Sequence, residues 1–135
     1  MVLVDTSVWI EVFRRPFTVR LGDVVAFDEV VTCLPIVQEV LQGFDDERAF
    51  RIACEAMLAL PIVESPMPAA LFEQAAALYR SARRAGRTVR SGVDCLIAAC
   101  AIRHDLELLH RDRDFTALAT VVPLRARDIG RSRAH

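Results

Sequence analysis

The chain of 135 residues contains no lysine, and all 17 of its basic residues are arginine. Its few histidines are scattered, so the sequence offers no histidine cluster that would bind zinc or copper. No apolar run approaches the ~20 residues that a membrane-spanning helix needs, and we expect no secretory leader because no basic n-region followed by an apolar h-region is present. We therefore expect a soluble, cytoplasmic protein that makes no contact with a membrane.

The four cysteines lie in apolar segments, with no C-x-x-C pair and no histidine at metal-ligand spacing. They are Cys33, Cys54, Cys95 and Cys100. This pattern is typical of small buried side chains rather than of a zinc site or a disulfide framework. Apolar residues make up 53% of the chain, which is enough for one hydrophobic core. We expect one domain over residues 1–130 and a basic C-terminal tail over 131–135, with disorder of that tail as one interpretation.

Strand-like and helix-like segments alternate along the chain. Strands are expected at 2–4, 30–34, 106–109 and 121–124, with 62–63 as a further candidate. Helices are expected at 7–13, 21–27, 35–42, 44–60, 68–85, 91–104 and 115–118. Such alternation favours a parallel sheet with helices on both faces. The predicted fold class is therefore α/β, with three layers around a central, mainly parallel sheet.

Four acidic residues do not fit the pattern of ordinary surface charge. Asp5 ends the first strand, Asp112 follows the strand ELLH, and Glu39 lies within the apolar segment IVQEVL. Asp94 lies in the first turn of a helix whose continuation is strongly apolar. Each also has a structural interpretation: Asp5 and Asp112 could cap helices, Asp94 could form a capping box with Ser91, and Glu39 could lie on an exposed helix face. The sequence leaves both interpretations open.

A parallel sheet gathers the carboxyl ends of its strands at one edge, where these acids would meet. Two unit charges about 4 Å apart repel by roughly 4 kcal/mol at an effective dielectric constant near 20, so a cluster needs either protonation or a divalent cation. Ligands that are all oxygen suit Mg²⁺ or Mn²⁺. Such ions activate water and neutralise charge that builds up on a phosphoryl group.

Two other classes of magnesium-dependent protein also place aspartates at strand ends. A receiver-type signalling domain requires a lysine beside the acids, and this chain has none. A phosphatase of the haloacid-dehalogenase type requires a second aspartate two residues after the first, where this chain has Ser7. Both classes are excluded.

Four sequence blocks together resemble the motifs of PIN-domain nucleases, and among these the VapC toxins: VDTS, PIVQEVL, RSGVDCLIAACA and LLHRDRDF. The resemblance runs over nearly the whole chain in the family's order. It implies a PIN-like three-layer α/β/α fold and a Mg²⁺- or Mn²⁺-dependent endoribonuclease. Such a toxin hydrolyses cellular RNA, tRNA above all, and so inhibits translation. The implied partners are a cognate antitoxin, the RNA substrate and a second copy of the chain in a homodimer.

The resemblance also implies roles for single residues. The catalytic and metal-binding acids of the family match Asp5, Glu39, Asp94 and Asp112. Glu39 would bind the ion directly or through water, and Asp114 matches a fifth, less uniform acid. A hydroxyl group would order the site, that of Ser7 in the first place or that of Thr6. The same hydroxyl would start the first helix and leave Asp5 free to face the cation.

Five arginines fall between Glu73 and Asp94, a stretch that contains no acid. They are Arg80, Arg83, Arg84, Arg87 and Arg90. We predict that they bind RNA phosphates, the first four from one helix face; the alternative is a solvated helix face. The basic segment 125–133 is a weaker candidate. Two other functions also stay open, a housekeeping RNA-processing nuclease and a catalytically silent PIN-like module, although no acid of the set is missing here.

Overall fold

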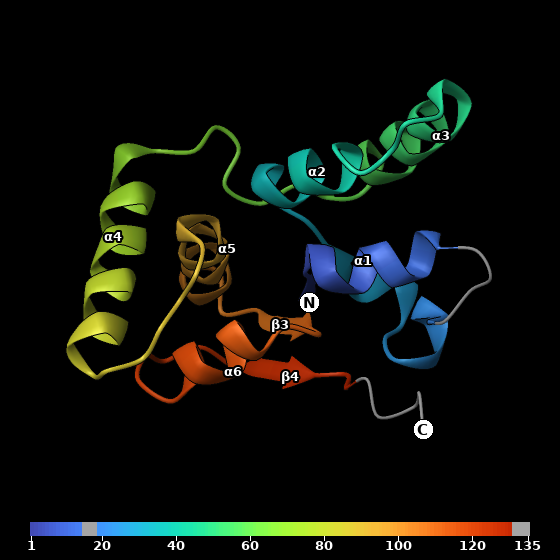
Figure 1. Ribbon diagram of the computed structural model, residues 1–135. Helices are drawn as coiled ribbons and strands as arrows, with labels where there is room; N and C mark the ends of the chain where they lie inside the picture. The colour runs from blue at the N-terminus through green and yellow to red at the C-terminus, as the bar shows by residue number, and fades with distance from the viewer. Residues whose placement is uncertain (15–18, 131–135) are drawn as a thin grey trace.

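A single sheet of four parallel strands forms the centre of the protein, with the strand order β2-β1-β3-β4 (Figure 1). The structure is a computed structural model that describes residues 1–14 and 19–130. The strands are β1 (Val2–Val4), β2 (Val30–Val31), β3 (Glu107–His110) and β4 (Ala126–Asp128). Helices cover both faces of the sheet, so the predicted three-layer α/β/α fold is confirmed.

The sequence explains why β1 and β3 lie in the middle of the sheet. All three residues of β1 are buried, and Leu108 and Leu109 of β3 are fully buried. A strand covered on both faces requires such a continuous apolar run, whereas a strand with one face exposed to solvent would alternate apolar and polar residues. Leu3 pairs with Leu108 and with Val31, so the central strand is held on both sides in one register.

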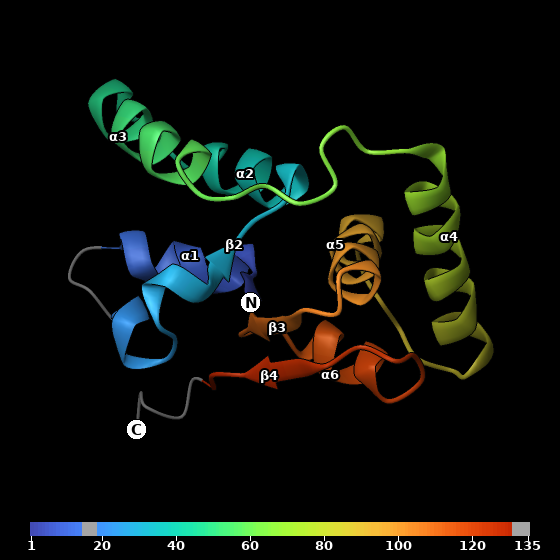
Figure 2. The same ribbon diagram turned by 180° about the vertical axis from the view of Figure 1, so that it is seen from behind.

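Six α-helices are found in the described part of the chain: α1 (Thr6–Phe13), α2 (Leu34–Leu41), α3 (Glu47–Leu58), α4 (Ala69–Arg84), α5 (Gly92–Arg103) and α6 (Arg113–Ala119). In both ribbon views α4 stands at one end of the molecule beside α5, and α3 reaches out at the other end (Figures 1 and 2). The apolar α5 packs between α4 and the sheet, which explains its run of buried residues. None of the described helices is long and apolar enough to span a membrane.

Two predicted segments differ from the structure. Residues 121–124 form turns, and the last strand lies at Ala126–Asp128, inside the basic segment 125–133. This edge strand has little apolar pattern because two of its three residues are exposed. The side chain of Arg127 in this strand pairs with Glu107 of β3 at 3.4 Å. The segment 21–27 forms short 3₁₀ turns rather than an α-helix. The predicted tail at 131–135 lies outside the described residues.

The candidate strand at 62–63 is reduced to one isolated parallel bridge between Thr32 and Ile62. The cysteine prediction is confirmed for Cys33, Cys95 and Cys100, which are buried free thiols, while Cys54 is only partly buried.

Candidate active site

The carboxyl ends of β1 and β3 form the floor of the site. Asp5 follows β1, and its backbone N–H donates to the carbonyl of Leu109 in β3 at 2.9 Å. Arg111 and Asp112 follow β3 directly. Because the two strands run in the same direction, their ends bring Asp5 and Asp112 to one edge of the sheet, as the sequence predicts.

Asp5 is both a helix cap and a site residue. It is only 4% exposed, and its Oδ2 accepts the backbone N–H of Ser7 at 2.9 Å and the hydroxyl of Ser7 at 2.6 Å. The expectation that a hydroxyl would start the helix in its place is therefore wrong, since the carboxylate of Asp5 is the N-cap of α1. Its other oxygen, Oδ1, takes no part in these bonds. Burial raises the pKa of Asp5, and the bonds from Ser7 oppose that rise.

Ser7 and Thr6 fix two different parts of the site. The hydroxyl oxygen of Ser7 also accepts the backbone N–H of Arg111 at 2.9 Å, so it joins the loop after β3 to the end of β1. The hydroxyl of Thr6 donates to Oε1 of Glu39 at 2.8 Å. Glu39 is half-buried in α2, which argues against an exposed helix face. The structure thus gives both hydroxyls contacts that would order the site.

Asp94 carries the clearest electrostatic signal of the cluster. Its helix α5 is capped by Ser91, whose Oγ accepts the N–H of Val93 at 3.1 Å, so the start of the helix does not depend on the Asp94 carboxylate. The pKa of Asp94 is raised to about 7, and burial of the carboxyl group is the largest cause. The negative charges of the other four acids contribute the rest of this rise, in the order Asp5, Asp112, Asp114 and Glu39. The five acids are therefore close enough to repel one another.

Asp112 and Asp114 both pair with the guanidinium of Arg90, and both lie at the start of α6. Oδ1 of Asp112 accepts the N–H of Asp114 at 2.9 Å and caps α6. Arg90 reaches both acids, with Nη2 at 3.3 Å from Asp112 and Nε at 3.0 Å from Asp114. Asp114 is only 6% exposed and belongs to the cluster, although it was expected only as a fifth, less uniform acid. Arg90 was predicted to bind RNA; here it pairs with acids.

Not all of the remaining arginines lie on helix α4. Helix α4 ends at Arg84, and Gly86 follows with a φ of 75°, a left-handed conformation that favours glycine. Arg87 therefore lies beyond the helix, and the prediction that it shares a helix face with Arg80 and Arg83 is wrong. Arg90 and Arg111 line a cavity of about 370 Å³ beside Asp112.

Two features of the site were missed by the sequence argument. His110 is 1% exposed, and its Nδ1 accepts the N–H of Asp112 at 3.1 Å, which fixes the loop that carries this acid. Burial lowers the pKa of His110, which favours the neutral ring. Arg111 pairs with Glu11 of α1 at 3.2 Å, and both side chains are less than one-fifth exposed, at 17% and 15%. The sequence signal for the His110–Asp112 hydrogen bond is a histidine two residues before an acid. The Arg111–Glu11 ion pair has no local signal, because it joins two distant segments of the chain.

The donor set suits a divalent cation that prefers oxygen. One carboxylate oxygen from each of Asp94, Asp112 and Asp114 lies within 4.8 Å of the others. Asp5 and Glu39 add carboxylates close enough to raise the pKa of Asp94. Mg²⁺ and Mn²⁺ take such oxygen ligands together with water, whereas zinc and copper favour nitrogen and sulfur. A cation here would also offset the repulsion between the acids.

The family model of the PIN domain matches residues 2–121 of the chain. Ribonuclease VapC11 of Mycobacterium tuberculosis is 40% identical over 131 residues, which cover 93% of this chain and 97% of that protein. The chain therefore belongs to the PIN-domain family, and within it to the VapC ribonucleases.

Solved structures give the same fold at low identity. VapBC-5 from Mycobacterium tuberculosis, a member of the VapBC family of toxin–antitoxin systems, is similar with a TM-score of 0.69 at 21% identity, over 95% of this chain and 98% of that chain. VapC20 from Mycobacterium tuberculosis, a toxin that cleaves the sarcin–ricin loop, is similar with a TM-score of 0.69 at 24% identity, over 93% of this chain and 99% of that chain.

Proposed function

We propose that this VapC-type nuclease is a Mg²⁺- or Mn²⁺-dependent endoribonuclease that cleaves structured cellular RNA, tRNA in the first place, and thereby inhibits translation. The observation that carries the proposal is the position of Asp94, whose pKa is raised by burial and by the charges of four other acids. Maintaining so unfavourable a cluster favours a role in binding a cation, because a purely structural site would be more stable with fewer charges.

The roles of the residues follow from their contacts. Asp5, Asp94 and Asp112 would hold the cation, directly or through water, and Asp114 would support it from its buried position. When bound, the ion polarises the scissile phosphate and lowers the pKa of the attacking water. Glu39 would orient that water with the oxygen left free by its bond from Thr6. Ser7 would hold Asp5 and the loop after β3 in fixed positions relative to each other, because its hydroxyl group bonds to both.

The same proposal includes the partners of a toxin. The similarity to a member of the VapBC family of toxin–antitoxin systems supports a cognate antitoxin, and we propose the homodimer on the family resemblance. A small open reading frame directly upstream would favour the toxin over a housekeeping nuclease. The silent-module alternative is disfavoured because every acid is present and the acids converge.

The test is cleavage of purified total RNA by the purified protein with Mg²⁺, with Mn²⁺ and with a chelator. We expect cleavage only with a metal ion, and loss of most activity in Asp5→Asn and Asp94→Asn. The matched control is Asp45→Asn, which removes an exposed acid outside the cluster. Cleavage that persists in the chelator, or equal rates in all variants, would falsify the mechanism. Separate tRNA and ribosomal RNA arms decide the substrate, since VapC20 cuts the sarcin–ricin loop.

A further inference from the structure

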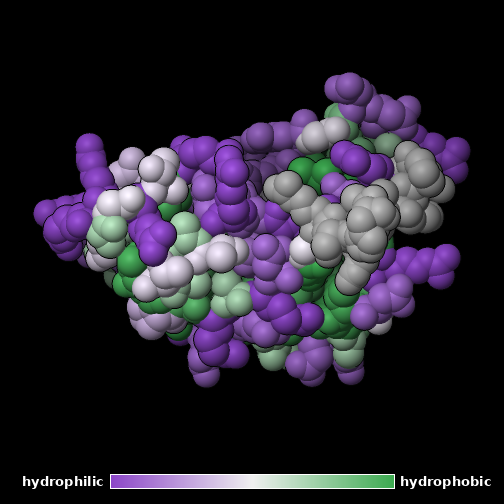
Figure 3. Space-filling view, turned by 60° about the horizontal axis from the view of Figure 1, so that its bottom comes forward, coloured by the Kyte–Doolittle hydropathy of each residue, from purple (hydrophilic) through white to green (hydrophobic). Residues whose placement is uncertain are grey.

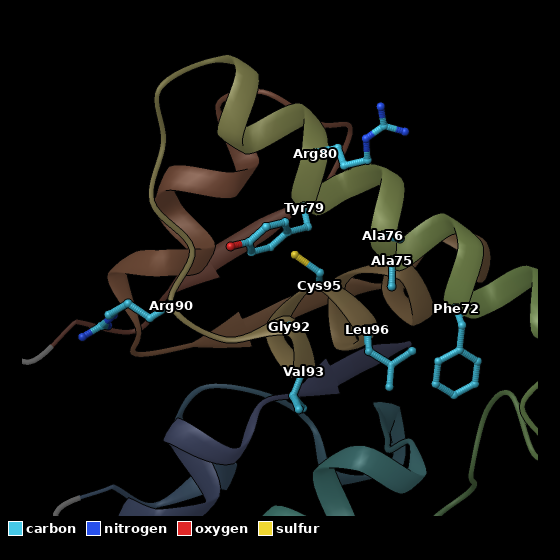
Figure 4. Close-up of a pocket in the computed structure, with 10 residues that line it drawn as sticks. All are labelled: Phe72, Ala75, Ala76, Tyr79, Arg80, Arg90, Gly92, Val93, Cys95 and Leu96. Atoms are coloured by element: carbon cyan, nitrogen blue, oxygen red, sulfur yellow. The ribbon is translucent and has the colours of Figure 1, made fainter.

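A second cavity lies between α4 and α5, and its lining, among the described residues, contains no acidic residue (Figure 4). Its volume is about 720 Å³, and its walls are largely apolar. Two aromatic side chains of α4, Phe72 and Tyr79, line it although they are 47% and 38% exposed. They are seven residues apart, two turns along the same helix face, which separates them by about 10 Å. We call this cavity the α4–α5 groove.

The groove opens beside the acidic cluster. Gly92 and Val93, the two residues before Asp94, are part of its wall. A Cβ built on Gly92 would meet no atom within 4 Å, so the groove is open at this point. Arg90, which pairs with Asp112 and Asp114, lines both the groove and the cavity beside the acids. In Figure 4 the ring of Tyr79 lies on the Arg90 side of the groove, and Phe72 lies at the far end.

The charge around the groove favours a polyanion as its occupant. Arg80 and Arg90 line it, and the guanidinium carbon of Arg83 lies 6.0 Å from the centre of the Tyr79 ring. No acid occurs between Glu73 and Asp94. In Figure 3 purple hydrophilic side chains and pale to green surface lie next to one another on the left of the molecule, the side on which Figure 1 shows α4. Exposed aromatic rings between arginines are the elements with which proteins bind single-stranded RNA, through stacking on bases and contacts to phosphates.

We propose that the α4–α5 groove binds a single-stranded nucleotide next to the scissile phosphate, with its base stacked on Tyr79 and its neighbouring phosphate held by Arg80 or Arg83. Phe72 extends the same apolar wall for the following base. The inference deepens the proposed ribonuclease function and rests on it. It assigns to α4 the selection of unpaired RNA, while the acids perform the hydrolysis.

The first experiment measures binding directly, with a single-stranded RNA oligonucleotide that carries 2-aminopurine, in a chelator. Stacking on an aromatic ring quenches this base. We expect quenching by the wild type and by Tyr79→Phe, and weaker binding by Tyr79→Leu, about 5- to 30-fold, because leucine keeps the apolar bulk and lacks a π face. Equal binding by the phenylalanine and leucine variants would overturn the proposal.

The second experiment uses a matched pair of charge variants on α4. Ala76 lines the groove, whereas Ala77 is exposed and lies outside the groove lining. Ala76→Glu places a carboxylate in the path of the RNA, and Ala77→Glu adds the same charge elsewhere on the helix. We expect Ala76→Glu to raise KM for RNA cleavage about 5- to 30-fold, with kcat changed less than about twofold, and Ala77→Glu to leave both close to the wild type.

The outcomes separate the two proposals. If the wild type does not cleave RNA with Mg²⁺ but 2-aminopurine quenching depends on Tyr79, the groove assignment stands and the nuclease mechanism fails. If the wild type cleaves and Ala76→Glu behaves as Ala77→Glu, the groove assignment fails. Sedimentation completes the test: a halved mass of Ala76→Glu with unchanged RNA binding would mean that a second copy covers the groove, and it would overturn the proposal.

Discussion

The substitution Asp94→Asn should make the metal-free protein more stable while it abolishes the response to magnesium. The pKa of Asp94 is raised from 3.8 to about 7, so the fold carries this carboxylate at a cost once it ionises. A group with a raised folded-state pKa contributes its full stability below the unfolded value, and that contribution is lost as the pH rises through the folded value. Asparagine keeps the shape of the side chain and never ionises.

The size of the effect follows from the rise of the Asp94 pKa from 3.8 to about 7. At 1.36 kcal/mol for each pKa unit, this rise gives an upper bound of about 4 kcal/mol. Because the Asp94 side chain is only partly buried, contact with water reduces the cost of its charge. We therefore expect Asp94→Asn to raise the free energy of unfolding by about 1–2 kcal/mol. For a chain of this length that gain raises the Tm by about 3–8 °C at about pH 8. At about pH 5 the wild-type carboxyl is protonated in the folded state, so most of the gain disappears.

Thermal unfolding followed by circular dichroism in a chelator, at both pH values, measures the effect. Addition of Mg²⁺ should then raise the Tm of the wild type and leave that of Asp94→Asn nearly unchanged. Asp45→Asn, an exposed substitution of the same kind, should behave as the wild type throughout. A lower Tm of Asp94→Asn at about pH 8, or an equal gain at both pH values, would refute the reasoning that burial and the neighbouring charges raise the pKa of Asp94.

Three further results are expected. Ser7→Ala should lower the Tm by about 3–12 °C, because the N–H of Arg111 loses its partner at a cost of about 1–3 kcal/mol; an unchanged Tm would contradict the role of Ser7. Arg90→Gln should raise the pKa of Asp94 further, since a positive charge leaves its two aspartate partners, and carboxyl chemical shifts in an NMR titration measure this; a lowered value would be inconsistent with the ion pairs. Calorimetry should find that Mg²⁺ binds about tenfold more weakly at about pH 6 than at about pH 8, because the proton of Asp94 must leave first; affinity that is independent of pH would remove Asp94 from the metal site.

The sequence predicts the central features of this fold because they rest on apolar patterns. Val2–Val4 and Leu108–Leu109 are continuous buried runs, and such runs are recognisable as strands of a parallel sheet. Their directions place Asp5 and Asp112 at one edge without further information. The edge strand Ala126–Asp128 could not be found in the same way, since an exposed edge imposes no apolar pattern on its side chains.

The candidate site was predictable in its acids and less so in the groups that hold them. The acids follow from strand ends and helix starts, which are local features of the sequence. The pairing of Arg90 with Asp114, 24 residues away, and the bond from Ser7 to Arg111 depend on how distant segments meet. The capping role of Asp5 was wrongly assigned because a carboxylate has two oxygens and can serve a helix and a site together.

The acids of this cluster differ in what the fold loses when each is replaced. Asp5 and Asp112 start α1 and α6, so an alanine at either position removes a cap worth about 1 kcal/mol along with any activity. Asp94 starts no helix, because Ser91 caps α5. Selection against a harmful nuclease would therefore favour substitutions at position 94. There the activity is lost without loss of fold stability, so the inactive protein stays folded and can still bind its partners.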